Sequence, residues 1–349
     1  MTMFFKPLLG IVLAGLLGQA QAADPVTIRI GTPDQGAGSA PFIAGPVGLA
    51  HIQKQLENEF AADGVKVEWH FFKGAGPAVN EALANQQLDF AWLGDLAAII
   101  GRSSGLQTRL LLGARGNNMY LATRAGSDIH SLADLKGKRV AVYRGTADQL
   151  SFARALAAQG LKEHDLQIIS LDWSAARAAL ASGQIDATWS GMGILALGQQ
   201  GVQFPLSTKQ LPRLATTQAG LVATQAFIDQ HPDLTQRLVT VLVKNAAWLT
   251  DTRNQPAYNQ QMAEQSAIPA TLFEQEAKGD NLAFRESPRI DPFLRASLQD
   301  SVEQAKALGL VRRPFDTADW VEPRFVDAAI EQLKIGSLWP TFDANGKAL

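Results

Sequence analysis

The sequence predicts an α/β protein in which short strands and helices alternate. From residue 26 to about residue 190, short apolar runs are separated by segments with helical spacing of their apolar residues. Such alternation is typical of βα units, which build a mostly parallel sheet, or two of them. After residue 223 the pattern changes, and nearly all of 225–310 has helical spacing. With 349 residues, 46% of them hydrophobic, the chain is long enough for two lobes with sizeable cores.

The first elements follow from alternation and from turn residues. Residues 26–30 (V-T-I-R-I) alternate and are rich in β-branched side chains, so a strand is expected there. The loop 31–41 is too rich in glycine and proline for regular structure. We expect a helix after this loop that ends near residue 63, and then a second strand at 65–72 (V-K-V-E-W-H-F-F).

The next two units each place a glycine turn between a strand and a helix. Pro77 suits the first position of one helix. Asp95, in the run Trp92-Leu-Gly-Asp-Leu, is expected to be the N-cap of the other. The elements expected in this part of the chain are a helix at 78–85, a strand at 87–91, a helix at 96–103, and strands at 110–112 and 119–123.

A third unit of this kind centres on Gly145. The apolar run 138–143 predicts a strand, Gly145 ends it, and Thr146 stands where a helix N-cap belongs. Gln149, three residues further on, is a candidate capping-box partner. The remaining expected elements are helix 147–159, strand 167–171, helix 174–182, strand 185–189, and helices 232–250 and 292–308 with Asp233 and Asp291 as candidate caps.

Three junctions of strand, glycine and helix therefore stand in one chain, near 73–77, 94–96 and 145–147. A helix start presents free backbone N–H groups and the positive end of the helix dipole, which favours an anion. In open α/β sheets, ligands bind outside the carboxyl ends of the strands, where such junctions gather. For any single junction, an ordinary βα turn without a ligand is the alternative interpretation.

The N-terminus predicts export. Lys6 supplies a positive start, 8–17 is a short apolar run, and Ala20-Gln21-Ala22 is a small-x-small cleavage site. The run is too short to span a membrane. We therefore expect 1–22 to be a signal peptide that is cleaved after Ala22, and the mature protein to be periplasmic or exterior. An uncleaved anchor is the alternative.

Composition excludes several classes of function. The chain has no cysteine, which rules out a disulfide scaffold, a lipid-anchored start, a thiolate nucleophile and a zinc–thiolate site. Nucleic acid is not expected as a partner, because its phosphates attract a positively charged protein and this chain has a formal net charge of −2. The five histidines lack metal-ligand spacing, and neither a G-x-S-x-G motif nor a P-loop occurs. No catalytic residue, no metal and no cofactor is expected.

Several segments, taken in order, resemble ABC-transporter substrate-binding proteins for sulfonates, taurine and nitrate. Residues 74–105 resemble the part of that family where a Gly-Pro helix leads to a Gly-Asp turn, and 126–161 continue it with S-L-A-D-L-K-G-K-R-V-A-V. The later matches are D-W-S-A-A-R-A-A-L-A-S-G-Q-I-D-A-T-W at 172–189, the start F-I-D-Q-H-P-D-L within 224–238, and the tail P-R-I-D-P…A-L-G-L-V-R-R-P-F-D. The resemblance covers about 25–335.

The resemblance implies a two-lobed periplasmic binding protein fold of type II, with the ligand in a cleft between two α/β lobes. Lobe one would comprise 24–121 plus 224–349, and lobe two 122–223, with hinge crossings near 120–123 and 221–224. Such proteins deliver a small anion to the membrane permease of an ABC importer and perform no chemistry. We expect a monomer whose ligand is an organic sulfur anion, either a sulfonate or a sulfate ester.

The candidate ligand-binding residues lie at the strand ends. Thr146 and Ala147 of lobe two would bind an oxyanion from one side. Gly94, Asp95 and Leu96 of lobe one would bind it from the other side. Arg115 or Arg144 could pair with it, and a tryptophan could cover its tail. Each role has an alternative without a ligand. The helix-start residues could serve only as caps, the arginines could be exposed on the surface, and the tryptophans could pack in the core. The full set of candidates is Asp34, Gln35, Ser39, Trp92, Gly94, Asp95, Leu96, Arg115, Gly145, Thr146, Ala147 and Trp189.

The chain departs from the family at its ligand loops, which leaves the ligand open. The loop 32–41 is long and glycine-rich, Asp148 follows the Gly145 turn, and Trp189-Ser-Gly-Met-Gly replaces the family's usual sequence. A bulkier ester, such as an aryl or alkyl sulfate, is one form of the expected ligand, and the alternative ligands are nitrate, taurine or another small anion. Alternative roles are a ligand-sensing partner of a membrane receptor and an enzyme similar to thiamine pyrimidine synthases. Those synthases depend on a cysteine-rich motif that this chain lacks.

Overall fold

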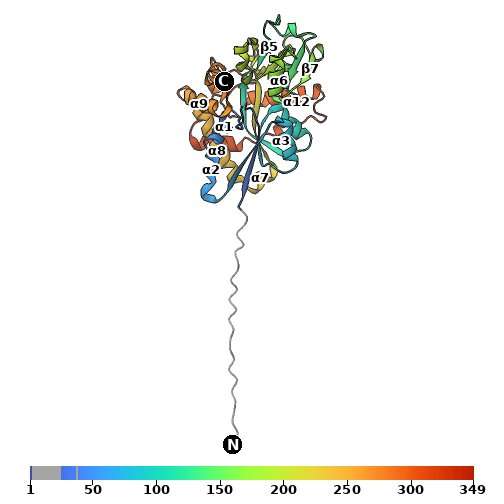
Figure 1. Cartoon of the computed structure of the whole chain (residues 1–349). Coiled ribbons are helices and arrows are strands. Elements are labelled where there is room, and N and C mark those ends of the chain that lie inside the picture. The colour runs from blue at the N-terminus through green and yellow to red at the C-terminus, as the bar shows by residue number, and fades with distance from the viewer. Residues whose placement is uncertain (2–24, 37) are drawn as a thin grey trace.

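Two five-stranded sheets, each flanked by helices, form the molecule (Figure 1). The structure is a computed structural model that describes residue 1, residues 25–36 and residues 38–349. The expected signal peptide and its cleavage site therefore lie outside the described residues, apart from residue 1. The predicted two-lobed α/β architecture is confirmed.

The first sheet has the strand order β2-β1-β3-β10-β4. Its first three strands are parallel, and the fourth runs antiparallel to both of its neighbours. The strands are β1 (Thr27–Pro33), β2 (Lys66–Phe72), β3 (Phe90–Gly94), β4 (Thr108–Asn117) and β10 (Thr217–Thr224).

The second sheet repeats this arrangement, with the order β7-β6-β8-β5-β9. Here the antiparallel fourth strand is β5. The strands are β5 (Tyr120–Thr123), β6 (Arg139–Val142), β7 (Gln167–Ser170), β8 (Ala187–Ser190) and β9 (Gln203–Ser207).

The chain passes from one sheet to the other twice. The first passage lies between β4 and β5, at residues 118–119, and the second between β9 and β10, at residues 208–216. The stretch 120–123 thus forms β5 in the second sheet, and 221–224 ends β10 in the first. That the passages act as hinges stays a prediction.

Thirteen α-helices surround the sheets within the described residues. Helices 232–250 and 292–308 were predicted almost residue for residue, because apolar periodicity and a proline at the start mark both. The helices are α1 (Gly45–Ile52), α2 (Gln55–Phe60), α3 (Ala75–Ala84), α4 (Asp95–Ser103), α5 (Ala147–Ala157), α6 (Trp173–Ala181), α7 (Gln225–Gln230), α8 (Pro232–Thr250), α9 (Gln255–Ser266), α10 (Ala270–Ala277), α11 (Leu282–Arg285), α12 (Pro292–Ala307) and α13 (Arg324–Leu333).

Four local predictions had different outcomes. The helix expected to end near residue 63 is split into α1 and α2, because Lys54 adopts a left-handed φ of 51°. Helix α3 begins before Pro77, which is its third residue rather than its first. Asp291 does cap α12, since its Oδ1 accepts a hydrogen bond from Leu294 N at 3.1 Å. Asp233 does not cap α8, whose N-cap is His231.

Each sheet has its own hydrophobic core. One large cluster surrounds the first sheet and includes Ile28, Phe90 and Leu238. The second sheet is covered on both faces by separate clusters, and Tyr120 and Leu121 of β5 belong to different ones. Because successive strand residues point to opposite faces, this division is the expected result of burying both sides of a sheet.

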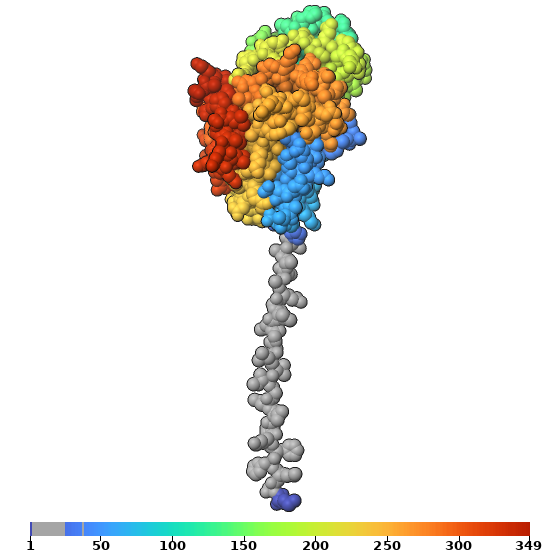
Figure 2. Space-filling model, turned by 90° about the vertical axis from the view of Figure 1, so that its left-hand side faces the viewer, coloured from blue at the N-terminus to red at the C-terminus, as the bar shows by residue number. Residues whose placement is uncertain are grey.

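Segments from both ends of the chain lie together around the first sheet. In Figure 2 the green and yellow-green middle of the chain forms one end of the molecule, and the blue, orange and red parts form the remainder. The orange C-terminal helices reach the second lobe, where α10 contacts the 3-10 helix Met192–Gln200. Among the described residues, no helix has the length and apolar character needed to cross a membrane.

Candidate functional site

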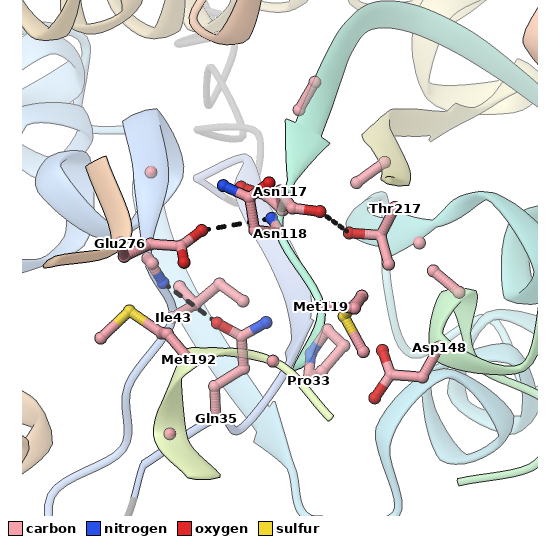
Figure 3. Close-up of a pocket in the computed structure, with 18 of the residues that line it drawn as sticks. Pro33, Gln35, Ile43, Asn117, Asn118, Met119, Asp148, Met192, Thr217 and Glu276 are labelled. Carbon is pink, nitrogen blue, oxygen red and sulfur yellow. Dashed lines mark hydrogen bonds between the residues drawn. The ribbon is translucent and has the colours of Figure 1, made fainter. Parts of the chain in front are cut away.

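A cavity of about 230 Å³ lies between the two lobes. Its wall combines strand ends from both sheets, the first passage between the sheets at residues 118–119, and the C-terminal helices α9–α11. Figure 3 shows part of this wall, with Pro33 and Gln35 from the first lobe and Asp148 and Met192 from the second. The cavity is thus the place where the expected interlobe ligand site belongs.

The start of α5 lies in the cavity wall, as Thr146 and Ala147 both line it. Thr146 is the N-cap, as predicted, with an extended φ of −114°. Its hydroxyl donates to Tyr143 O at 2.7 Å instead of accepting from the helix, and Gln149 Oε1 accepts from Gly145 N at 3.0 Å. Gly145 itself, with φ of 77°, makes the turn and does not line the cavity.

The start of α4 lies directly against the start of α5. The N-cap of α4 is Gly94 and not Asp95, so that prediction was wrong. Of the expected trio, Gly94 lines the cavity, whereas Asp95 and Leu96 do not. A Cβ atom added to Gly94 would lie 2.8 Å from the Cβ of Ala147. The two helix starts therefore meet at one point of the interlobe contact.

Asp95 takes part in a buried contact between the lobes. Its Oδ1 accepts from Leu96 N and its Oδ2 from Ser301 Oγ, each at 2.8 Å. Arg154, from α5 in the second lobe, approaches this carboxylate to 3.6 Å and pairs with Asp300 of α12 at 2.8 Å. Burial raises the pKa of Asp95, and the Arg154 guanidinium opposes this shift. The contacts of Arg154 with Asp95 and Asp300 thus link the two lobes beside the cavity.

Arg115 lines the cavity, but its guanidinium is already paired with the carboxylate of Asp291. The side chain is 1% exposed, and its Nη1 donates to Asp291 Oδ1 at 2.7 Å and Oδ2 at 2.9 Å. The rings of Phe284 and Phe293 lie 5.7 and 5.6 Å from its guanidinium carbon. The alternative, Arg144, lies 4.0 Å from Glu163, is about half exposed, and does not line the cavity.

The two candidate tryptophans lie in different places. Trp92, in the middle of β3, lines the cavity and is 6% exposed. Trp189 is buried in the second lobe, where its Nε1 donates to Ser151 Oγ at 2.9 Å and its ring lies 5.7 Å from that of Phe152. Trp92 is therefore placed to contact a ligand, and Trp189 packs in the core.

The loop after β1 contributes only part of what was expected. Gln35 lines the cavity, and its Oε1 accepts from Ala44 N at 3.4 Å. Asp34 does not line it, because its Oδ1 holds the loop by accepting from the backbone N–H groups of Gly36 and Phe42. Ser39 is exposed and lies outside the cavity wall.

Arg177 of α6 lines the cavity and was not among the residues predicted from the sequence. Its Nη2 donates to Ser174 Oγ at 3.1 Å, and no carboxylate of the described chain lies within 4.0 Å of it. Partial burial lowers its pKa, and Asp172 opposes this. Trp173, four residues earlier, also lines the cavity. This i, i+4 spacing places both side chains on one helix face and is the signal that could have identified Arg177.

The C-terminal helices supply a second set of unexpected wall residues. Glu276 accepts hydrogen bonds from Asn118 N at 3.2 Å and from the Tyr120 hydroxyl, so α10 is tied to the first passage between the sheets (Figure 3). Arg285 lies 3.3 Å from Glu276 and 3.6 Å from Glu286. The two contacts of Glu276 with Asn118 and Tyr120 join residues more than 150 positions apart, and no local pattern indicates them.

Asp148, the second residue of α5, is a buried carboxyl group in the cavity wall. It is 8% exposed, and its Oδ2 accepts from Trp173 Nε1 at 2.8 Å. Burial raises the pKa of Asp148 to about 6, against the opposing effect of the tryptophan hydrogen bond. Such a group changes its charge near neutral pH.

The arrangement is suited to binding. Helix-start N–H groups and the Arg177 guanidinium can hold an anion, and apolar side chains such as Trp92, Met119 and Phe273 can contact its remainder. Within 25–36 and 38–349, no three His, Asp or Glu side chains are grouped so as to hold a metal ion.

Comparison with known sequences gives one family and several relatives. The family described as NMT1/THI5 like matches residues 59–255. A protein of Escherichia coli (strain K12) that carries the name of an aliphatic sulfonates-binding protein is 30% identical over 210 residues. That match covers 57% of this chain and 61% of the relative. The chain thus spans about three fifths of that relative's length.

Comparison with solved structures extends the match to almost the whole chain. The crystal structure of a sulfonate-binding periplasmic protein from Methylobacillus flagellatus KT is 30% identical, with a TM-score of 0.80. The match covers 92% of this chain and 98% of that one. A desulfurization enzyme at 17% identity and a TM-score of 0.63, covering 88% of this chain and 99% of its own, shares the fold alone. The relatives of higher identity carry the names of binding proteins.

Proposed function

Since the chain belongs to the NMT1/THI5-like family, we propose that it is a periplasmic solute-binding protein for a small organic sulfur anion. The ligand, a sulfonate or a sulfate ester, occupies the interlobe cavity and is delivered to the permease of an ABC importer. The names of the relatives support this assignment, as they give sulfonates as ligands and the periplasm as location.

The observation that carries the proposal is the combination of Arg177 and the start of α5 in one cavity wall. Arg177 has no carboxylate within 4.0 Å in the described chain, so its charge is available to a ligand. Charge-assisted hydrogen bonds from a guanidinium and from helix N–H groups suit the oxygens of a sulfonate. The apolar walls around Trp92 and Phe273 suit an alkyl or aryl tail.

Calorimetry on the purified mature chain tests the proposal. The titrants are ethanesulfonate, octanesulfonate, taurine, 4-nitrophenyl sulfate and nitrate. We expect at least one sulfonate or sulfate ester to bind with a Kd well below 1 mM, which corresponds to more than about 4 kcal/mol of binding free energy. If none of the sulfur compounds binds more tightly than that, the proposal fails, and tight binding of nitrate alone would reassign the ligand.

Delivery to an importer is tested in the cell. A strain that lacks this protein should not grow when the bound sulfonate is its sole sulfur source, and should grow normally on inorganic sulfate. Undiminished growth on the sulfonate would contradict a transport role and favour a sensing role.

Fractionation with N-terminal sequencing should find the protein in the periplasm beginning at Ala23, and light scattering should give a monomer.

A binding role also has to be separated from catalysis, because the fold is shared with a desulfurization enzyme. The chain has no cysteine to serve as a nucleophile. We expect the bound ligand to be recovered unchanged when a stoichiometric mixture is incubated and analysed by mass spectrometry. If sulfite or sulfate is released faster than in a control that lacks the protein, the binding role is overturned.

A further inference from the structure

Asp148 is the one carboxyl group at the start of α5 that faces the cavity. It is 8% exposed, and its Oδ2 is occupied by Trp173 Nε1. Within the described chain, its Oδ1 has no hydrogen-bond partner on another residue, and no cationic group lies within 4.0 Å of either oxygen. Figure 3 shows the carboxyl group directed toward the side of the cavity where Met119 and Pro33 lie.

The surroundings of Asp148 disfavour its charged form. Burial is the main cause, and the carboxylate of Asp95 on α4 adds to it. From the other neighbouring elements, the titratable and charged groups are Tyr143 before α5, Asp172 at the N-cap of α6, and Arg177 in the middle of α6. The hydrogen bond from Trp173 favours the charged form, yet the pKa of Asp148 remains raised to about 6. An anion beside this carboxyl group would disfavour the ionised form further.

We propose that Asp148 takes part in anion binding as a neutral acid whose Oδ1–H donates a hydrogen bond to the ligand head group. This inference rests on the proposed binding of sulfur anions at the same site. When Asp148 is ionised before binding, one proton from solvent must be added to its carboxylate as the anion enters. An anion without an ionisable proton, such as a sulfonate, therefore binds together with a proton.

The proposal predicts a specific dependence of affinity on pH. The carboxyl group has a higher pKa in the complex than in the free protein, so affinity is full below the free pKa and falls as pH rises above it. With a free pKa of about 6, the Kd of a sulfonate should rise about 50-fold between pH 6 and pH 8. Net proton uptake should rise over the same range from about one half to nearly one per site.

The test is calorimetry with ethanesulfonate and 4-nitrophenyl sulfate, neither of which carries an ionisable proton between pH 5.5 and 8.5. Each titration is repeated in two buffers of different ionisation enthalpy, which gives the number of protons taken up. Asp148→Asn keeps the shape of the side chain and offers an N–H donor in place of the O–H. We expect this variant to bind with a Kd that is nearly constant with pH and, at pH 8, at least tenfold tighter than the original chain.

Two further variants assign the proton. Asp128→Asn changes an exposed carboxylate outside the cavity and should keep both the Kd and the proton uptake of the original chain. Asp95→Asn removes the other buried carboxyl group near α5, and proton uptake should persist in it, whatever its affinity. Loss of proton uptake in Asp95→Asn would overturn the assignment to Asp148.

The remaining outcomes separate this inference from the proposed function. If either probe binds with a constant Kd and no proton uptake, Asp148 does not act as described, and the binding role stands. If Asp148→Asn loses affinity at every pH while its circular dichroism is unchanged, the carboxylate itself is required, and the inference is wrong. If no anion binds at any pH, the proposed function fails and this inference fails with it.

Discussion

Two arginines in the cavity wall have opposite surroundings at the scale of single residues. Arg115 is fully buried and forms a two-oxygen pair with Asp291, which in turn caps α12. Arg177 is partly exposed and has only the Ser174 hydroxyl as a partner in the described chain. A guanidinium that is already paired has little to offer an anion, whereas an unpaired one retains its donors.

Replacing Arg177 should therefore weaken ligand binding. A hydrogen bond to a charged group contributes about 1.5–3 kcal/mol, so Arg177→Gln should raise the Kd of a bound sulfonate by about 10- to 150-fold. Calorimetry measures the Kd, and circular dichroism checks the fold. The matched control is Arg253→Gln, which changes an exposed arginine outside the cavity. Equal affinity in both variants would exclude Arg177 from the binding site.

Replacing Arg115 should instead destabilise the fold. Arg115→Ala leaves Asp291, 6% exposed, without its charge partner. Removing one partner of a buried pair costs about 3–5 kcal/mol of unfolding free energy. Urea denaturation measures this loss, with Arg253→Ala as a control that should leave stability almost unchanged. A loss close to that of the control would show that the pair contributes little.

At the scale of elements, the start of α5 offers a test of the helix N–H groups. Ala147 is the first residue of α5, and Thr146 before it is extended, a conformation that tolerates a following proline. Ala147→Pro therefore removes one N–H donor and keeps the helix. We expect the Kd of a sulfonate to rise about tenfold or more, since a donor to a charged group is lost.

Ala147→Gly is the control for this helix start, because it keeps the N–H and removes only the Cβ atom. Its Kd should change much less than that of the proline variant. If the two variants bind equally well, the N–H group of residue 147 does not contact the ligand. The start of α5 would then serve only as a turn.

At the scale of the whole molecule, the two lobes meet through small residues. All three atoms nearest to a Cβ added at Gly94 belong to Ala147 in the other lobe, and one added at Gly76 would lie 3.5 Å from Gly145 O. Arg154 of the second lobe contacts Asp300 and also approaches Asp95, the residue that follows Gly94. We propose that the lobes close on a ligand at this contact, so larger side chains here should prevent closure.

Gly94→Val should hold the lobes apart without unfolding them. Small-angle scattering should give the same radius of gyration with and without saturating ligand, whereas the original chain should become more compact on binding. Affinity should fall at the same time, since a cleft that cannot close leaves the ligand partly solvated. The control is Gly198→Ala, where the added Cβ meets only an ordinary contact with Phe204. Ligand-induced compaction in Gly94→Val would contradict this role.

Much of the fold could be predicted because its signals are local. Apolar alternation, glycine turns and caps are read within about ten residues, so the strand before Gly145, the N-cap Thr146 and helix α8 were predicted almost as the structure has them. Two local signals compete at the start of α4. Asp95 is a good capping residue, but Gly94 takes the cap and the Asp95 carboxyl turns to Ser301 of α12.

The sequence alone thus determined the alternating α/β pattern, the helix starts available for an anion, and the absence of cysteine chemistry. Tertiary structure decided which of these features share a cavity. It buried Trp189, paired Arg115 with a residue 176 positions away, and placed Arg177 and Asp148 in the wall. The physical reason is that a side chain's charge and exposure depend on partners that only the topology brings near, whereas a cap or a strand depends on its immediate neighbours.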